Sequence, residues 1–486
     1  MKTNYLLIFF LFLPASIHTV GAHNNQLADN NPVTIRWNNE KQEIDGFGVS
    51  QAGWAYRLYI HYQRDEVMDL LFGDNGLKLN MLRGEVFPHY WENEGDKSFS
   101  LEDDINLSLD DPYMVQECDD LKRRGQLWVT KMAKEKYNVN KLMFSAWSPP
   151  AYMKSNNAVS NGYLQRKYHQ EYANFLTAFC KAYKSIGLEP YAISPSNEPG
   201  YPAPWNSSLW TADKMGRFII ENLGPTFKRE GISAKIVFGE NPFWSVNNQM
   251  LASISSLHFV DMIINEYPEI KEYNTVASGH GYPITDEFGP LKAILNTPIV
   301  PFKSAEENNI PVWMTEISTT DPLDIGMDNG LVWAENFHKY LTDASINAFI
   351  WWAGALPANN NEGLITLDKD RKNYQTSKRF ETFGNFTRYI PSGSKRVEAS
   401  SGNDDLLISA YKNSNNFTLV LINKSDEIIT SALQIEEQSI TGKINTYLTN
   451  ADNCWNNGTV NYDKKKKEYS IAVPARSVMT VTGRVK

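Results

Sequence analysis

Short apolar runs alternate with longer amphipathic segments from about residue 46 to residue 385. The short runs, such as "VWMTE" and "AFIWWAG", have the apolar character of strands buried on both faces, and the segments between them repeat large residues at intervals of three and four, as helices do. The candidate strands begin at Ile44, Leu79, Leu142, Tyr191, Lys235, Val276, Val312 and Ala348. Eight strands, each followed by a helix, predict an α/β fold whose main domain is a (β/α)8 TIM barrel.

Two of the intervening segments show the helical period clearly. In "YHQEYANFLTAFCKAYKSIG", which begins at Tyr168, the large residues share one face, and Gly187 is expected to end the helix. In "LWTADKMGRFIIENLG", Thr211 is expected to cap the helix and Gly224 to end it. A doubly wound open sheet is the competing architecture, but no glycine-rich phosphate turn follows the first strand.

The pattern changes after about residue 389, where stretches such as "LLISAYKNSNNFTLVLINKS" alternate apolar and polar residues between turn residues. This alternation is typical of antiparallel strands with one buried face. The segment "VTIRWNNEKQEIDGFG" ahead of the barrel predicts a strand, a turn and a second strand, which we expect to pair with this region. We therefore predict a catalytic barrel over residues 46–388 and a fused side β-sandwich built from residues 33–45 and 389–486.

The first 22 residues have the pattern of a signal peptide. A lysine near the start is followed by an apolar run, and small residues end at Ala22. The run is too short to span a membrane, and we see no later apolar stretch long enough to do so. We expect a secreted or periplasmic protein after cleavage near Ala22.

The composition narrows the class of partner. The net charge of -9 argues against nucleic acid. The 13 tryptophans and 24 tyrosines suit cores or the binding of flat ligands such as sugars. The three cysteines are scattered, without the close pairs that metal sites use. We expect no metal and no cofactor, and we expect a monomer.

Two glutamates stand at the ends of predicted strands. Glu198 follows the fourth strand in "ISPSNEPG", where Pro-Gly stops the strand, and Glu316 ends the seventh. In a barrel the carboxyl ends of the strands meet at one face, which carries the chemistry. Two carboxyl groups across one barrel mouth are what glycoside hydrolysis needs, one as acid and one as nucleophile or base. A single glutamate at a strand end is more often a surface group, so the prediction depends on the pair.

Other polar and aromatic residues end the same strands. Arg83 is placed to pair with an ionised carboxylate, and His280 either joins the site or caps its strand. Glu240 and Asn241 also end a strand, but we leave them outside the predicted site. The aromatic residues that are expected to face sugar rings are Trp147, Tyr201, Tyr282 and Trp352.

Several motifs together resemble glycoside hydrolase family 30, above all its xylanase-like branches, the glucuronoxylanases and xylobiohydrolases. They are "IDGFGVSQAGWA", "MLRGE", "SAWSPPAYMKSN", "YAISPSNEPGY", "GHGYP", "WMTEIS" and "WW" followed by "GLITLD", and they occur in order at the spacing of barrel strands. The resemblance implies a retaining β-glycosidase with Glu198 as general acid/base and Glu316 as nucleophile. It also implies that Asn197 hydrogen-bonds the 2-hydroxyl of the sugar, and that Arg83, Trp147, Tyr201, Tyr282 and Trp352 line the sites on either side of the scissile bond.

The resemblance implies cleavage of β-1,4-xylosidic bonds in xylan or substituted xylan. In some relatives an arginine after the "GFG" motif binds a glucuronate branch. Here the nearest candidate, Arg57, is displaced from that position, and the loop "GALPANNNEGLITLD" has no cation. A β-1,6-glucan, a galactan or a β-glucosyl conjugate is the alternative substrate, because rim loops decide substrate choice on this fold. A glycan-binding protein without catalysis is the alternative from another class.

Overall fold

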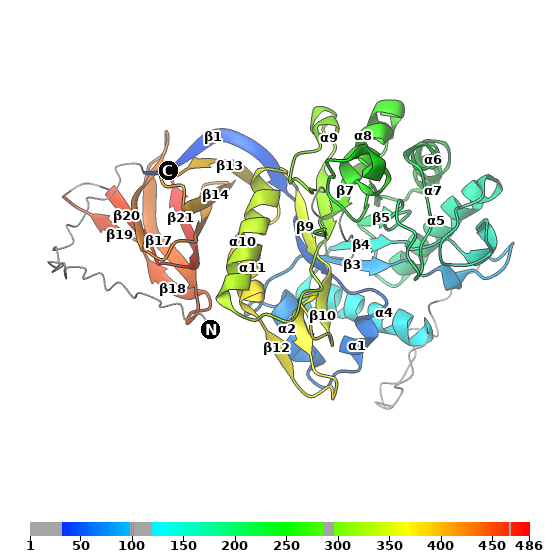
Figure 1. The fold of residues 1–486 in the computed structure, drawn as a ribbon, viewed down its shortest axis with the longest axis horizontal. Helices are drawn as coiled ribbons and strands as arrows, with labels where there is room; N and C mark the ends of the chain where they lie inside the picture. The colour runs from blue at the N-terminus through cyan, green and yellow to red at the C-terminus, as the bar shows by residue number, and fades with distance from the viewer. Residues whose placement is uncertain (1–31, 98, 100, 102–118, 285–295, 466–467) are drawn as a thin grey trace, which may run out of the picture.

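The computed structural model describes residues 32–486 apart from 98, 100, 102–118, 285–295 and 466–467 (Figure 1). The predicted signal peptide therefore lies outside the described residues. A barrel fills one side of the molecule, a strand-rich body fills the other, and two helices pack between them (Figure 1). The predicted fold class, a (β/α)8 barrel with a side β-sandwich, is confirmed.

Eight parallel strands close the barrel. Each pairs with its neighbours in sequence order, and the first pairs with the last through Gly46 and Ala348. Apolar side chains from all but the first of the eight strands fill the barrel interior, among them Met81, Val237 and Trp313. The strands are β2 (Gly46–Ser50), β3 (Met81–Glu85), β4 (Lys141–Ser145), β5 (Ala192–Ser194), β6 (Lys235–Phe238), β7 (Thr275–His280), β8 (Val312–Glu316) and β9 (Ala348–Trp351).

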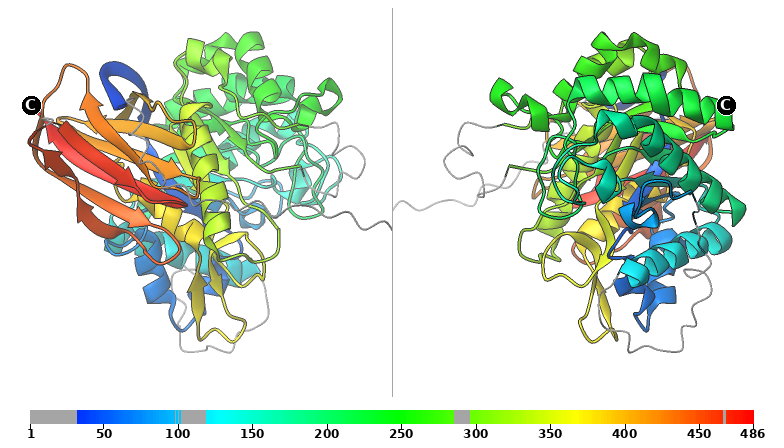
Figure 2. Two further views of the ribbon diagram at one scale, coloured as in Figure 1. Left: turned by 60° about the vertical axis from the view of Figure 1, so that its left-hand side comes forward. Right: turned by 90° about the vertical axis from the view of Figure 1, so that its right-hand side faces the viewer.

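Helices surround this barrel (Figure 2). Their apolar faces pack on the strands in one large core that also includes part of the β-sandwich. The described α-helices are α1 (Ala55–Tyr59), α2 (Arg64–Phe72), α4 (Asp119–Tyr137), α5 (His169–Ser185), α6 (Ala212–Phe218), α7 (Gly224–Glu230), α8 (Ser256–Glu266), α9 (Lys303–Glu307), α10 (Met327–Thr342) and α11 (Lys378–Thr387).

Two of the predicted helix signals are right and one is wrong. Gly187 follows α5 with a φ of 81°, and the Thr211 side chain caps α6 by accepting from the Lys214 amide. Gly224 does not end its helix: a π-helical turn over Ile219–Leu223 carries the chain into α7, which ends at Glu230 and is followed by Gly231 with a φ of 66°. A Cβ at position 224 would lie 2.6 Å from the Tyr273 ring, so this glycine serves close packing.

The remaining long strands form the side domain. The order of its ten strands is β18-β17-β21-β15-β14-β13-β1-β16-β20-β19. Strands from both halves of this order share one apolar core, with Leu419 and Val481 from one half and Leu433 and Ile471 from the other. The strands are β1 (Val33–Ile44), β13 (Ser394–Ser400), β14 (Leu406–Asn413), β15 (Asn416–Asn423), β16 (Ile429–Ile435), β17 (Ile440–Thr449), β18 (Asn456–Thr459), β19 (Asn461–Asp463), β20 (Glu468–Val473) and β21 (Ser477–Val485).

The N-terminal segment joins the two bodies. It is one strand, β1, with bulges on either side of Glu40, rather than the predicted strand, turn and strand. It pairs with β13 and β16 and then leads directly into β2. Helix α11 adds a second connection, because the side-chain Nδ2 of Asn385 donates to the Tyr447 carbonyl at 3.0 Å and to Thr480 Oγ1 at 3.1 Å.

A small sheet extends the barrel after its last strand. It consists of β10 (Ala353–Leu356), β11 (Gly363–Leu367) and β12 (Tyr374–Thr376). It lies on the same side of the barrel as α1 and forms one wall of the cleft described below (Figure 1). None of the described helices has the length and apolar character to cross a membrane.

Candidate active site

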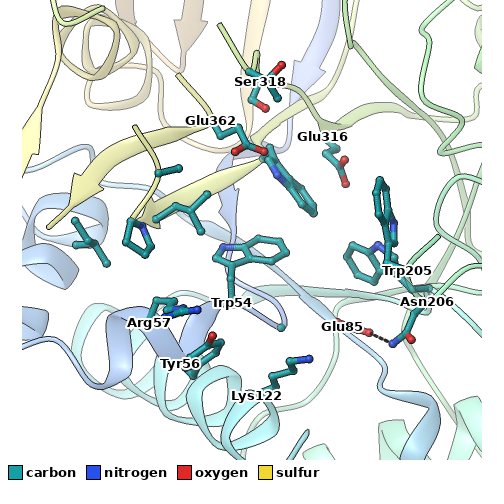
Figure 3. A pocket seen from close by; sticks show the side chains of 18 of the residues that line it. Trp54, Tyr56, Arg57, Glu85, Lys122, Trp205, Asn206, Glu316, Ser318 and Glu362 are labelled. Carbon is teal, nitrogen blue, oxygen red and sulfur yellow. Dashed lines mark hydrogen bonds between the residues drawn. The ribbon is translucent and has the colours of Figure 1, made fainter. Parts of the chain in front are cut away.

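A cleft of about 1920 Å³ opens at the carboxyl ends of the barrel strands (Figure 3). Its walls come from the loops after β2, β3, β5 and β8 and from the sheet β10–β12. Two predicted site residues, Arg83 and His280, lie beneath the cleft and are fully buried. The other seven line it: Trp147, Asn197, Glu198, Tyr201, Tyr282, Glu316 and Trp352.

Glu198 is held at the cleft by an unusual backbone. Strand β5 ends at Ser194, so the glutamate lies on the loop that follows, with a φ of 46°. Such a conformation costs a non-glycine residue about 1–3 kcal/mol. It is fixed because the Asn197 amide donates to the Ala146 carbonyl at 2.8 Å and the Glu198 amide to the Glu240 carbonyl at 2.9 Å. The strained backbone turns the carboxyl group into the cleft.

Glycine at position 200 completes this turn. A Cβ there would lie 1.8 Å from the Ser253 carbonyl oxygen, which leaves no room for a larger residue. The Gly200 amide also donates to Asn241 Oδ1 at 2.8 Å. The "NEPG" motif therefore ends in glycine because the backbone of the next barrel unit passes directly beside it.

Glu316 is the last residue of β8 and accepts two strong hydrogen bonds. Arg83 Nη1 donates to its Oε2 at 2.8 Å, and the Tyr282 hydroxyl donates to its Oε1 at 2.6 Å. Burial, with the nearby charge of Glu198, raises the pKa of Glu316 above its usual value, and His280, Arg83 and the Tyr282 hydroxyl offset only part of the rise. The two donors favour the ionised form of this carboxyl group.

The two carboxyl groups meet across the cleft. One oxygen of Glu198 and one of Glu316 lie within 4.8 Å of each other and of a ring nitrogen of His280. His280 Nδ1 lies 3.2 Å from Glu198 and 3.5 Å from Glu316. Burial alone would lower the pKa of His280, but Glu316, Glu198 and Glu240 raise it to about 9. The neighbouring carboxylates therefore favour the protonated form of His280, whose Nδ1 contacts both carboxyl groups.

Arg83 organises the layer beneath the cleft. Besides Glu316, its Nη2 donates to Asn197 Oδ1 at 2.6 Å and to Glu240 Oε1 at 3.0 Å. Its guanidinium carbon lies 4.9 Å from the centre of the Trp147 ring. One buried cation thus fixes groups at the end of β8 and on the loops after β4, β5 and β6, since a planar guanidinium can donate in several directions at once.

Among the described residues, Glu198, His280 and Glu316 are the only group of such side chains close enough together to hold a metal ion. A metal ion binds neutral imidazole. The raised pKa of His280 works against this, and hydrogen bonds from Arg83 and Tyr282 already engage Glu316. The chemistry of these groups suits proton transfer better than metal binding.

The structure adds residues that the sequence analysis left out. Glu240 is fully buried beside Arg83. Its position at the end of a predicted strand, like that of Glu316, was a signal in the sequence that could have identified it as a site residue. Trp54 packs against Trp352 with ring centres 4.3 Å apart, and Trp205 lies 6.4 Å from Tyr201. Both tryptophans lie on loops, where the strand pattern carries no information (Figure 3).

The cleft is amphipathic. Trp205 is 54% exposed and Tyr201 37% exposed, although both line the cavity. Flat aromatic rings that remain exposed in a cleft suit the apolar faces of sugars. Arg57, the displaced arginine of the sequence analysis, also lines the cleft, and its guanidinium lies over the Tyr56 ring at 4.7 Å (Figure 3).

Replacing Arg83 by lysine is expected to impair the site although the charge is kept. An ammonium group cannot reach three acceptors with the geometry of a guanidinium. We expect Arg83→Lys to lower kcat/KM by about 100-fold, as misplaced catalytic groups do. The measurement is steady-state hydrolysis of an aryl β-glycoside, with Arg217→Lys on the exposed face of α6 as the control. Equal activity of the two variants would contradict the role of Arg83.

Comparisons with known proteins agree with this geometry. The family description "O-Glycosyl hydrolase family 30" matches residues 30–366, and "Glycosyl hydrolase family 30 beta sandwich domain" matches residues 393–481. Glucuronoxylanase XynC of Bacillus subtilis (strain 168) is 23% identical over 459 residues, which are 92% of this chain and 90% of XynC.

Solved structures share the whole fold. The catalytic domain of GH30 xylanase C from Talaromyces cellulolyticus matches with a TM-score of 0.72 and 23% identity, covering 93% of this chain and 99% of that one. The endo-β-1,6-glucanase BT3312 matches with a TM-score of 0.69 and 17% identity, covering 93% and 94%. At these identities the two structures establish a common fold.

Proposed function

Because the chain belongs to O-glycosyl hydrolase family 30 and is a retaining O-glycosyl hydrolase, we propose that it cleaves β-1,4-xylosidic bonds in xylan or substituted xylan. We propose Glu316 as the nucleophile and Glu198 as the general acid and base. We also propose that the protein is secreted, acts as a monomer and uses no cofactor.

One observation carries the catalytic assignment. The two carboxyl groups approach within 4.8 Å across a cleft of sugar-binding character. A retaining mechanism places its carboxyl groups about 5–5.5 Å apart, whereas an inverting one leaves about 6.5–9.5 Å for a water molecule between them. The short separation supports attack on the sugar by a carboxylate rather than by water.

The surroundings of each glutamate support its assigned role. Glu316 accepts from Arg83 and Tyr282, so its negative charge is stabilised before it attacks. Glu198 lies on the loop that also carries Tyr201 and Trp205. This places the acid beside an aromatic surface that is suited to the leaving sugar.

The reaction then has two balanced steps. In the first, a Glu316 oxygen bonds to the anomeric carbon, the glycosidic C–O bond breaks, and the proton of Glu198 passes to the leaving oxygen. In the second, the Glu198 carboxylate takes a proton from water, the water oxygen bonds to the anomeric carbon, and the bond to Glu316 breaks. Glu198 ends protonated and Glu316 ionised, as both began.

The neighbouring residues have positioning roles in this proposal. Asn197 Oδ1 is held by Arg83, which leaves the amide nitrogen free to donate to the 2-hydroxyl of the sugar. Trp352 lies between Trp54 and Trp147, with ring centres 4.3 and 6.2 Å away. This group of rings supplies a stacking surface for the sugar that remains bound to Glu316.

The choice of xylan has separate support. Glucuronoxylanase XynC matches 92% of the chain, and the structure of xylanase C matches 93%. The fold of the β-1,6-glucanase BT3312 covers the chain equally well, so β-1,6-glucan is the second candidate. The fold and the catalytic pair do not distinguish the two polymers, because the loops of the rim decide the substrate.

A polysaccharide panel tests the proposal. We expect the purified protein to release soluble oligosaccharides from xylan, and proton NMR of the early products to show the β-anomer first because the configuration is retained. Release of oligosaccharides from β-1,6-glucan but not from xylan would show that β-1,6-glucan is the substrate. Binding to these glycans without any hydrolysis would overturn the catalytic assignment.

A further inference from the structure

Glu240 lies at the centre of the buried layer beneath the two proposed catalytic glutamates. It is 0% exposed and does not line the cleft. Its Oε1 accepts from Arg83 Nη2 at 3.0 Å, and its Oε2 accepts from the Ser145 hydroxyl at 2.6 Å. Because the side chain cannot touch a sugar in the cleft, its contribution must act through the groups that it contacts.

The backbone around Glu240 is built to place it there. Glu240 has a φ of 47°, nearly the same as the 46° of Glu198, and Gly239 before it has a φ of 116°. A Cβ at position 239 would lie 2.0 Å from the Ser278 carbonyl oxygen. The Glu240 carbonyl accepts from the Glu198 amide at 2.9 Å. Two adjacent barrel loops therefore adopt strained conformations that hold each other.

His280 connects Glu240 to the proposed catalytic pair. Its Nδ1 faces Glu198 and Glu316, while its Nε2 faces Glu240 Oε1 at 3.8 Å. Nε2 is buried and has no hydrogen-bond partner among the residues that the structure describes. The carboxylate of Glu240 is thus the charge that balances this edge of the imidazolium ring.

A count of charges shows what Glu240 contributes. Its layer contains three carboxyl groups, on Glu198, Glu240 and Glu316, and two cations, Arg83 and His280. The other polar groups that face it, Ser145, Asn197 and Tyr282, are neutral. With Glu240 ionised, the layer is neutral when one proton remains on the Glu198–Glu316 pair. That is the state from which acid catalysis starts.

We infer that Glu240 is a positioning residue of the reaction proposed above: its buried negative charge balances Arg83 and His280, and its carbonyl fixes the backbone of Glu198. This inference rests on the proposed function. In this role Glu240 does not contact the substrate. Its negative charge, and not only its shape, is needed to keep one proton bound to the Glu198–Glu316 pair.

The titration behaviour agrees with this assignment. Burial alone would raise the pKa of Glu240, but Arg83, His280 and the Ser145 hydroxyl hold it well below its usual range. Glu240 is in turn one of the carboxylates that raise the pKa of His280 to about 9. Removing its charge is expected to lower the pKa of each neighbouring group, because a nearby negative charge favours protonation.

The variant Glu240→Gln tests the inference, because it keeps the shape and removes the charge. We expect both limbs of the pH profile of kcat/KM on an aryl β-glycoside to move to lower pH, by about one unit or more for a charge removed at this distance. Glu240→Asp keeps the charge and should leave the limbs near their wild-type positions. Glu335→Gln is the matched control, because Glu335 pairs with Lys339 and Lys424 and does not line the cleft.

If Glu240→Gln lowers kcat but leaves both limbs of the pH profile in place, Glu240 contributes only packing, and the inference is overturned. A second measurement does not depend on the folding of a variant. In the wild-type protein, ¹⁵N NMR of the histidine rings should show His280 protonated on both nitrogens at pH 7.5, and a neutral ring would also overturn the inference. Absence of glycosidase activity in the wild type would instead remove the proposed function, while the NMR result would still report on the charge balance.

Discussion

Glu316→Gln should be folded and almost inactive, with kcat lowered by about 10⁴-fold or more, the range seen when a nucleophile is removed. Glutamine has the shape of glutamate, and its one carbonyl oxygen can still accept from Arg83, which contacts Glu316 at 2.8 Å, while its NH2 group can donate to the Tyr282 hydroxyl oxygen, which contacts Glu316 at 2.6 Å. It cannot form the glycosyl ester, so both steps of double displacement are lost. The measurement is hydrolysis of xylan and of an aryl β-glycoside.

The control separates catalysis from folding. Glu335→Gln makes the same chemical change on α10, outside the cleft, and should keep wild-type rates. Thermal unfolding of Glu316→Gln should remain cooperative. A second variant, Glu316→Ala, should regain activity with added azide and give the α-glycosyl azide, since a small anion then attacks in place of the carboxylate. Near wild-type turnover by Glu316→Gln would show that Glu316 is not the nucleophile.

Glu198→Ala is expected to have an effect that depends on the leaving group. General acid and base catalysis contributes about 10²–10⁴-fold, so hydrolysis of xylan, whose leaving hydroxyl needs a proton, should fall within that range. An aryl glycoside with an acidic phenol needs no proton to leave. Its first step should be nearly unchanged, and the glycosyl ester on Glu316 should accumulate because no base activates water.

Added azide provides the diagnostic for this variant. Azide needs no general base, and the space left by Glu198 is within 4.8 Å of Glu316 across the sugar site. We expect faster turnover of the aryl glycoside and a β-glycosyl azide as product. Equal losses on xylan and on the activated glycoside, with no response to azide, would show that Glu198 is not the acid.

The barrel was predictable because its signals are local. Apolar runs such as "VWMTE" fall on β8 residue for residue, and Thr211 caps its helix as expected. The prediction failed where distant residues decide the conformation. Gly224 lies inside a continuing helix, and it is glycine because the Tyr273 ring leaves no space for a side chain there. No signal within the helix itself carries that information.

The site was predictable only in part. Strand-end positions identified Glu198, Glu316, Arg83 and His280, and the structure brings all four together. Glu240 gave the same strand-end signal and was set aside, because the sequence does not show which strand-end side chains point into the barrel mouth. The loop residues Trp54 and Trp205 gave no periodic signal at all, although both line the cleft.

The sequence by itself determined the order of strands and helices, the polar residues at or just beyond the strand ends, and the resemblance to a glycosidase family, since these depend on near neighbours along the chain. Only the tertiary structure decided that carboxyl oxygens of Glu198 and Glu316 lie within 4.8 Å of each other, and that the surrounding carboxylates raise the pKa of His280. Distances and pKa values arise from groups on different strands, brought together in a medium that excludes water. Burial and charge at one point in space are properties that no segment of the chain has on its own.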